Sequence, residues 1–302
     1  MYLEHFRLNE YPFTLTPDTG FFFDHGHHRE ALDVLVVALL GGEGFIKVTG
    51  EVGTGKTLLC RQLLHLLELD ERAVTAYIPN PCLNPAALRL ALAEELGISV
   101  SRKIGQHRLM QLLNERLLQL CADDRPVIVL LDEAQAMPDE SLEAIRLLTN
   151  LETEKRKLLQ VVLFGQPELD QHLAGDHLRQ LRQRISFSYE LKPLDHDLLG
   201  TYVQHRLEVA GYQGAPLFSP RAIRELHRRS GGIPRLVNLL CHKSLMAAYG
   251  CGATRVGRRH LVRAARDTEE VAPARVPWFA VLSGLLGFVA LTGASMIYAY
   301  TL

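Results

Sequence analysis

The chain has 302 residues, of which 47% are hydrophobic, and it carries 33 basic and 34 acidic side chains. This composition is ordinary for a folded protein and excludes disorder, a collagen-like repeat and a disulfide scaffold. The five cysteines are scattered without Cys-x-x-Cys spacing, so a structural zinc site is not indicated either. The net charge of −1 conceals an asymmetry: residues 1–220 sum to −9, residues 221–275 sum to +8, and residues 276–302 carry no charged side chain.

The first 30 residues contain acidic side chains and no long apolar run, so they do not resemble a cleaved secretory signal. We therefore expect the N-terminus to stay in the cytoplasm. His25, His27 and His28 lie close together, but no carboxylate or cysteine completes a set with metal-ligand spacing. A loop that caps the following helix is the favoured interpretation.

A phosphate-binding loop is predicted between a short apolar strand at 45–49 and a helix at 57–69. The loop reads GEVGTGKT, which has the G-x-x-x-x-G-K-T spacing in the strand-to-helix context that this motif requires. Its backbone N–H groups would surround the β- and γ-phosphates, Lys56 would add positive charge, and the Thr57 hydroxyl would bind Mg²⁺. The residues predicted to bind the nucleotide are Gly50, Glu51, Val52, Gly53, Thr54, Gly55, Lys56, Thr57 and Asp132.

The strand-and-helix pattern recurs along the chain. Further strands are predicted at 73–78, 127–132, 158–165 and 185–191, and the helices that follow the first three at 85–96, 139–151 and 176–183. Strands that alternate with helices predict an α/β fold, with a parallel sheet sandwiched by helices. After residue 191 only helical patterns occur, at 195–210, 219–230, 234–249 and 257–270, which predicts a small helical domain.

The apolar run VIVLLDE, residues 127–133, ends in two acidic residues. Four consecutive apolar residues predict a strand at the centre of the sheet, which would leave Asp132 at the carboxyl end of that strand, beside the phosphate-binding loop. There Asp132 would hold Mg²⁺, directly or through water, and Glu133 would polarise the attacking water. The alternative is a pair of surface acids at the end of a strand.

A transmembrane helix is predicted at 278–300, because these 23 residues are uncharged and would span about 35 Å as a helix. Trp278 at one end and Tyr298 and Tyr300 at the other would lie at the membrane interfaces, and the arginine-rich N-terminal flank predicts that this side faces the cytoplasm. A buried helix is the alternative. The predicted domains are an ATPase core at 1–192, a helical lid at 193–268, a juxtamembrane linker at 269–277 and the membrane helix.

The motifs GEVGTGKT, VLLDEAQ and GGIPR resemble those of the AAA+ ATPases. Within that superfamily the segments YLEHFRLNEYPFTLTPD, HREAL, DEAQAMP, LFGQPEL, LRQLRQRI and GGIPRLVNLLC resemble the ExeA (general secretion pathway protein A) type and its MshM relatives in MSHA pilus biogenesis. The resemblance covers about residues 1–265. It implies a P-loop AAA+ fold with a helical lid.

The resemblance also implies roles for two residues beyond the loop. Gln166, just after the fourth predicted strand, matches a polar sensor that contacts the γ-phosphate or its water, although a turn residue before Pro167 is the alternative. Arg235 in GGIPR matches the lid arginine that reaches the phosphates; the alternative is a solvated residue at a helix start. The N-terminal aromatic residues would resemble a segment that packs near adenine, or would form a hydrophobic staple onto the core.

Arg179, Arg182 and Arg184 lie in LRQLRQRI, where AAA+ proteins present an arginine to the ATP of a neighbouring subunit. The resemblance implies that one of them is such an arginine finger, with Arg184 and Arg182 favoured. A basic helix face is the alternative for each of them. A finger supplied in trans would make hydrolysis depend on a homo-oligomer that assembles on ATP binding.

Three functions are considered, of which the first is favoured because of the uncharged segment at 278–300, and the third is disfavoured because Lys56, Asp132 and Glu133 are all present. The first is an inner-membrane ATPase, with its catalytic domain in the cytoplasm, that assists type II secretion or type IV pilus (MSHA-like) assembly proteins. The second is a DNA-associated ATPase of transposition or replication; the basic region at 221–275 would contact DNA in that case and anionic lipid in the first. The third is a scaffold that binds ATP without hydrolysing it. Because the chain stops at Leu302, it is not expected to carry the peptidoglycan-binding domain of the ExeA type.

Overall fold

A computed structural model of the chain describes residues 2–70, 72–101, 104–151 and 157–268. Within this part of the chain, five parallel strands form one sheet in the order β2-β3-β4-β1-β5. The strands are β1 (Phe45–Thr49), β2 (Val74–Ile78), β3 (Val127–Leu131), β4 (Leu159–Gly165) and β5 (Ile185–Glu190). All five lie where the sequence predicts strands, so the α/β fold with a parallel sheet is confirmed.

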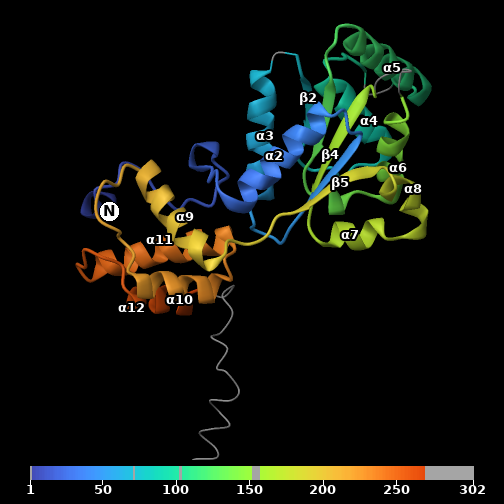
Figure 1. Cartoon of the computed structure of the whole chain (residues 1–302). Coiled ribbons are helices and arrows are strands. Elements are labelled where there is room, and N and C mark those ends of the chain that lie inside the picture. Colours follow the sequence, from blue (N-terminus) through green and yellow to red (C-terminus); the bar gives the residue numbers. More distant parts are fainter. Residues whose placement is uncertain (1, 71, 102–103, 152–156, 269–302) are drawn as a thin grey trace, which may run out of the picture.

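Helices cover both faces of the sheet (Figure 1). One face packs against α2 (Gly26–Leu40) and α3 (Lys56–Leu69), and the other packs against α4 (Pro85–Glu95), α5 (Gln106–Ala122) and α6 (Asp139–Leu148). Successive side chains of a strand point to opposite faces. Ile128 and Leu130 of β3 therefore join the core under α2 and α3, whereas Val127 and Val129 join the other core. Burial on both faces explains the continuous apolar runs in the central strands.

Several helices differ from the sequence prediction. The helix α5 has no predicted counterpart. For α2 the sequence predicts only a capping loop at its start; His25 is the N-cap residue, whereas His27 and His28 lie inside the helix. The predicted helix at 176–183 is a 3₁₀ turn, η3 (Asp176–Leu178), followed by the short α8 (Arg179–Arg182), and α7 (Glu168–Leu173) comes before both. The prediction missed α7, which begins directly after β4 with acidic residues in its first turn, where they interact favourably with the helix dipole.

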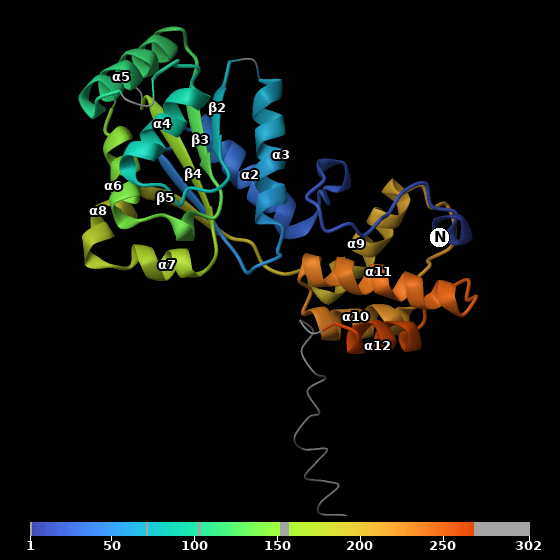
Figure 2. The same cartoon turned by 180° about the vertical axis from the view of Figure 1, so that it is seen from behind.

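Four helices pack together beside the α/β region (Figure 2). They are α9 (His196–Val209), α10 (Pro220–Ser230), α11 (Pro234–Gly250) and α12 (Arg258–Arg266). The N-terminal α1 (Tyr2–Phe6) packs on them, and Tyr2, Phe6 and Phe13 are buried in their common core. These aromatic residues therefore stabilise the helical region, as the staple interpretation expects. The domain limits at 192 and 268 stay a prediction.

The membrane segment predicted at 278–300 lies outside the described residues, as does the linker at 269–277. Among the residues that the structure does describe, no helix is both long enough and apolar enough to cross a membrane.

Candidate active site

The loop between β1 and α3 turns tightly enough to carry its backbone around a bound group. Gly53 and Gly55 have φ angles of 84° and 101°, in the left-handed region that favours glycine. A Cβ on Gly53 would lie 2.8 Å from the Cβ of Arg235, so the loop also needs glycine there for its close approach to α11. Buried His28 of α2 donates from Nε2 to the carbonyl oxygen of Thr54 over 2.9 Å, and this hydrogen bond holds the loop against α2.

Lys56 begins α3 and its side chain is buried. The ammonium donates to the carbonyl oxygens of Gly50 at 2.7 Å and Glu51 at 3.0 Å, so Nζ lies over the loop. Burial lowers the pKa of Lys56, and the carboxylates of Glu133 and Asp132 partly offset this effect. The site therefore holds a positive charge, which can bind a phosphate group, close to two carboxylates, which can bind a metal ion.

Asp132 follows β3 and is only 3% exposed. Its backbone N–H donates to the carbonyl oxygen of Ile78 over 3.1 Å, which extends the sheet pairing to the edge beside the loop. Burial raises the pKa of Asp132, while a hydrogen bond from the side chain of Thr57 acts in the opposite direction. Thr57 and Asp132 thus bring a hydroxyl and a carboxylate together, and these hard oxygen donors fit Mg²⁺.

Glu133 occupies a left-handed backbone conformation, with φ 55°, which is uncommon for a residue with a side chain. Its Oε2 accepts hydrogen bonds from the amide of Gln166 at 3.0 Å and from the amide of Gln135 at 2.5 Å. Oε1 of Gln135 accepts in turn from the backbone N–H of Gln166 at 3.0 Å. The structure therefore brings Glu133 and Gln166 together. Gln135 completes the network. It is part of the VLLDEAQ motif, but the sequence analysis assigns it no role in the site.

Arg235 lies at the start of α11, and its backbone N–H donates to the carbonyl oxygen of Gly53 over 3.1 Å. Around this junction is a cavity of about 390 Å³, which Lys56, Thr57, Glu133 and Gln166 line together with Arg235. The remaining lining residues are Thr14, Leu15, Thr16, Pro17, Asp18, Val52, Gly53, Gly55, Leu58, Tyr202, Arg206, Pro234 and Asn238. Both the α/β region and the helical region therefore contribute to one cavity.

Arg182 and Arg184 do not line this cavity. Arg182 donates from Nη1 to the carbonyl oxygen of Ala174 at 3.0 Å, and Arg184 donates from Nη1 to Oγ1 of Thr149 at 3.4 Å. Both side chains are exposed, as is that of Arg179. None of the three acts on the cavity of its own chain in this arrangement. Their role toward a neighbouring subunit stays a prediction.

The strand β1 is followed by a G-x-x-x-x-G-K-T loop and a helix, and two acidic residues follow β3, which β4 separates from β1 in the sheet. With a helical region that lines the same cavity, these features are those of the AAA+ class of P-loop proteins. Residues 39–173 match the family model described as an AAA domain. The chain is also 42% identical over 297 residues to general secretion pathway protein A of Aeromonas hydrophila. This similarity covers 98% of the chain and 53% of the relative, so the chain spans about half the length of that protein.

The chain therefore contains an AAA domain and is similar to proteins of the ExeA type, as its motifs imply. Solved structures agree with the fold: Cdc6p from Pyrobaculum aerophilum superposes with a TM-score of 0.64 at 19% identity over 83% of this chain and 70% of that one. The Aeropyrum pernix ORC1 protein, in complex with DNA, gives 0.61 at 22% identity over 85% and 69%. At these identities the likeness concerns the fold alone. The narrower resemblance to MshM stays a prediction.

Proposed function

We propose that this protein binds ATP with Mg²⁺ and hydrolyses it. The observation that carries the proposal is the position of Glu133, which lines the same cavity as Lys56 and Thr57 and is held there by Gln166. The loop N–H groups and Lys56 would bind the phosphates, and Thr57 with Asp132 would hold the metal. When bound, Mg²⁺ supplies positive charge to the phosphate oxygens.

In this mechanism Glu133 accepts a proton from the attacking water, as a general base. The amide of Gln166 donates to Glu133 and keeps its carboxylate in place. Gln166 also lines the cavity, and in this mechanism its amide would contact the γ-phosphate or the attacking water. Arg235 would add positive charge from the helical region as negative charge develops on the leaving phosphates.

The test is steady-state phosphate release by the full chain in detergent, together with equilibrium binding of ATP. Glu133→Gln keeps the size of the side chain and removes the base, so we expect turnover to fall by about 10²–10⁴ while ATP still binds. Glu140→Gln, at an exposed acidic position on α6, is the matched control and should leave both measurements unchanged. Equal turnover in wild type and Glu133→Gln would overturn the catalytic assignment.

We further propose that the protein works at the inner membrane as a homo-oligomer and uses ATP to assist assembly of a secretion or pilus machine. The similarity to general secretion pathway protein A supports this assignment, as does the uncharged segment at 278–300. The experiment is a pull-down from membranes with the Glu133→Gln chain, in which the ATP state should persist. Recovery of envelope assembly proteins is expected, whereas recovery only of replication or transposition proteins would overturn the proposal.

A DNA-associated ATPase is the second candidate, because the surface of α12 carries Arg258, Arg259, Arg263 and Arg266. The same arginines would suit anionic lipid, since each basic residue near such a surface contributes about 1 kcal/mol. Duplex DNA binding by the full chain, measured from low to physiological salt, separates the two. Binding that involves phosphate contacts must weaken steeply as salt rises, and weak or salt-insensitive binding would favour the membrane.

A further inference from the structure

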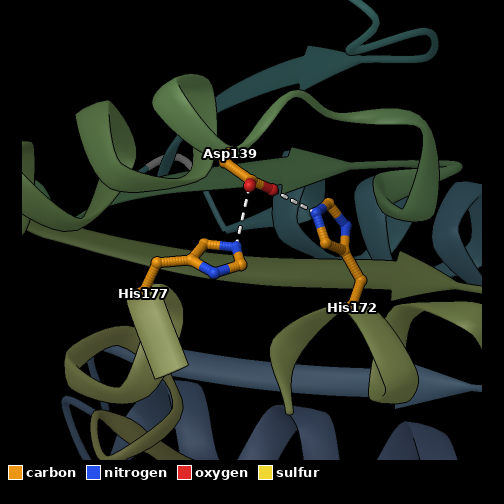
Figure 3. A group of neighbouring side chains, drawn as sticks. All are labelled: Asp139, His172 and His177. Carbon is orange, nitrogen blue, oxygen red and sulfur yellow. Dashed lines mark hydrogen bonds and ion pairs between the residues drawn. The ribbon is translucent and has the colours of Figure 1, made fainter. Parts of the chain in front are cut away.

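Three side chains outside the nucleotide cavity converge from separate elements (Figure 3). Asp139 is the first residue of α6, His172 lies in the last turn of α7, and His177 lies in η3. Nε2 of His172 is hydrogen-bonded to one carboxylate oxygen of Asp139, and Nε2 of His177 lies 2.7 Å from the other. We propose that these three residues form a binding site for a divalent transition metal of the Zn²⁺ class.

The donor set fits such a metal. Two imidazole nitrogens and one carboxylate oxygen suit Zn²⁺, Co²⁺ or Ni²⁺ better than Mg²⁺, which prefers oxygen ligands. The three ligand atoms all lie within 4.8 Å of one another. Tetrahedral Zn²⁺ with bonds of about 2.0–2.2 Å needs its ligands about 3.3 Å apart, so small side-chain rotations complete the site. The fourth position would be open to water.

A glycine between the two histidines allows their side chains to converge. Gly175 lies between them, and a Cβ at this position would come within 2.6 Å of Cε1 of His177. Only glycine therefore leaves room for the imidazole in this rotamer. Arg182 donates to the carbonyl oxygen of Ala174 over 3.0 Å and supports the same turn.

The site joins two segments that lead away from the active site. Asp139 begins the helix that follows the Glu133 segment, and α7 begins at Glu168, two residues after Gln166. A bound metal would therefore crosslink the segment that carries the base to the segment that carries the sensor. None of the three residues lines the nucleotide cavity, so this site is distinct from the pair formed by Thr57 and Asp132.

The experiment is calorimetric titration of the full chain with ZnCl₂, after chelator treatment, without a polyhistidine tag and with Mg²⁺ in excess. We expect one equivalent of Zn²⁺ to bind the wild type. Since removing even an outer-sphere partner of a metal ligand costs about 10–100-fold in affinity, His177→Ala and Asp139→Asn should each weaken binding at least about 10-fold. The control is His196→Ala, at another exposed histidine that lies 3.1 Å from a carboxylate, that of Asp197. Undiminished binding by His177→Ala would overturn the proposal.

Cysteine is the main competitor for Zn²⁺, because exposed Cys251 lies with its Sγ 3.4 Å from Nε2 of His260. Titration with Co²⁺ distinguishes the two sites, since thiolate ligation gives an intense charge-transfer absorption that nitrogen and oxygen ligands lack. Binding that survives in Cys251→Ser and shows no thiolate band supports the proposed site. Loss of the metal in Cys251→Ser, with retention in His177→Ala, would refute it.

A thermal measurement controls for folding. The side chain of His177 is 55% exposed, so His177→Ala should melt at the wild-type temperature when no metal is present. A metal that binds only the folded state raises the melting temperature. Zn²⁺ should therefore stabilise the wild type and the His196→Ala control, but not His177→Ala. Equal stabilisation of all three chains would contradict the site.

Discussion

The α/β region and the helical region share one cavity, but they contribute different groups to it. The α/β region supplies the loop, Lys56 and Glu133 to the cavity, and Asp132 lies beside it at the end of β3. The helical region supplies Arg235 from an exposed helix start, joined to the loop through a single backbone contact at Gly53. The groups proposed to act on the attacking water and the phosphates therefore belong mostly to the α/β region, and the helical region adds the positive charge of Arg235.

The helical region holds its own part of the cavity through Arg206 of α9. This side chain is 4% exposed, donates from Nε to the carbonyl oxygen of Pro12 at 2.5 Å, and lies over the ring of Phe21. It thereby fixes the N-terminal segment that lines the cavity, where Asn238 also donates to the carbonyl oxygen of Thr14 at 3.5 Å. The helical region therefore positions the N-terminal residues that line the cavity, in addition to supplying Arg235.

The largest effect on ATP turnover is expected at a third region, the surface that would face a neighbouring subunit. If Arg184 reaches the ATP of the next subunit, Arg184→Ala should lower turnover by about 10³-fold or more, because a trans arginine contributes about 10³–10⁵ in rate. ATP binding by the isolated chain should change little, since Arg184 does not line its own cavity. Arg108→Ala, at an exposed position on α5, is the control.

A mixing experiment makes this prediction sharper. Subunits with Glu133→Gln keep their arginines, and subunits with Arg184→Ala keep their base, so mixed assemblies should recover activity that neither chain has alone. Absence of recovery, with both variants folded and able to assemble, would argue against Arg184 as the finger. The same experiment with Arg182→Ala distinguishes the two favoured positions.

The next largest effect is expected at Arg235, which the helical region contributes to the cavity. Arg235→Ala removes a cation that would pair with a phosphate, and hydrogen bonds to charged groups contribute about 1.5–3 kcal/mol, or roughly 10- to 150-fold. We expect a loss of this size in turnover or ATP affinity. The control is Arg224→Ala, at an exposed arginine on α10 that does not line this cavity. An equal effect of both substitutions would indicate a general charge effect rather than a contact.

Sequence patterns were sufficient for the sheet and the loop because both depend on local spacing. The apolar runs predicted all five strands, and the G-x-x-x-x-G-K-T spacing predicted the loop in which Gly53 and Gly55 take left-handed angles. The missed helix α5 also has a local signal, since Leu109, Leu113 and Leu117 recur every four residues and are all buried. A stricter count of helical spacing would have found it.

The contacts that support the site could not be predicted in this way. His28 reaches Thr54 from 26 residues away, and Gln166 meets Glu133 across 33 residues. Such pairs depend on how α2 and β4 pack against the loop, which no spacing in a single sequence encodes. The metal site could not be predicted from sequence spacing either, because Asp139 is 33 residues from His172.

The smallest effect is expected on the free energy of unfolding, through a carboxylate that lies within the helical region. Glu225 of α10 is buried, and its carboxylate accepts hydrogen bonds from Arg228, from Arg229 at 3.0 Å and from Arg258 of α12 at 3.1 Å. Burial raises the pKa of Glu225, but the three guanidinium groups outweigh burial and hold the pKa below its ordinary value of 4.5. The ionised carboxylate therefore links α10 to α12.

Glu225→Gln should lower the free energy of unfolding at neutral pH by about 1–3 kcal/mol, as expected for lost hydrogen bonds to charged groups. Because the folded-state pKa lies below the unfolded value of 4.5, the unfolded chain binds more protons in that range. The wild type should therefore lose this stability as pH falls from about 4.5 through the folded pKa, and the variant should show a shallower loss. Chemical denaturation at several pH values measures this, with exposed Glu208→Gln as the control. Parallel pH profiles for wild type and Glu225→Gln would mean that the arginines stabilise α12 without this carboxylate.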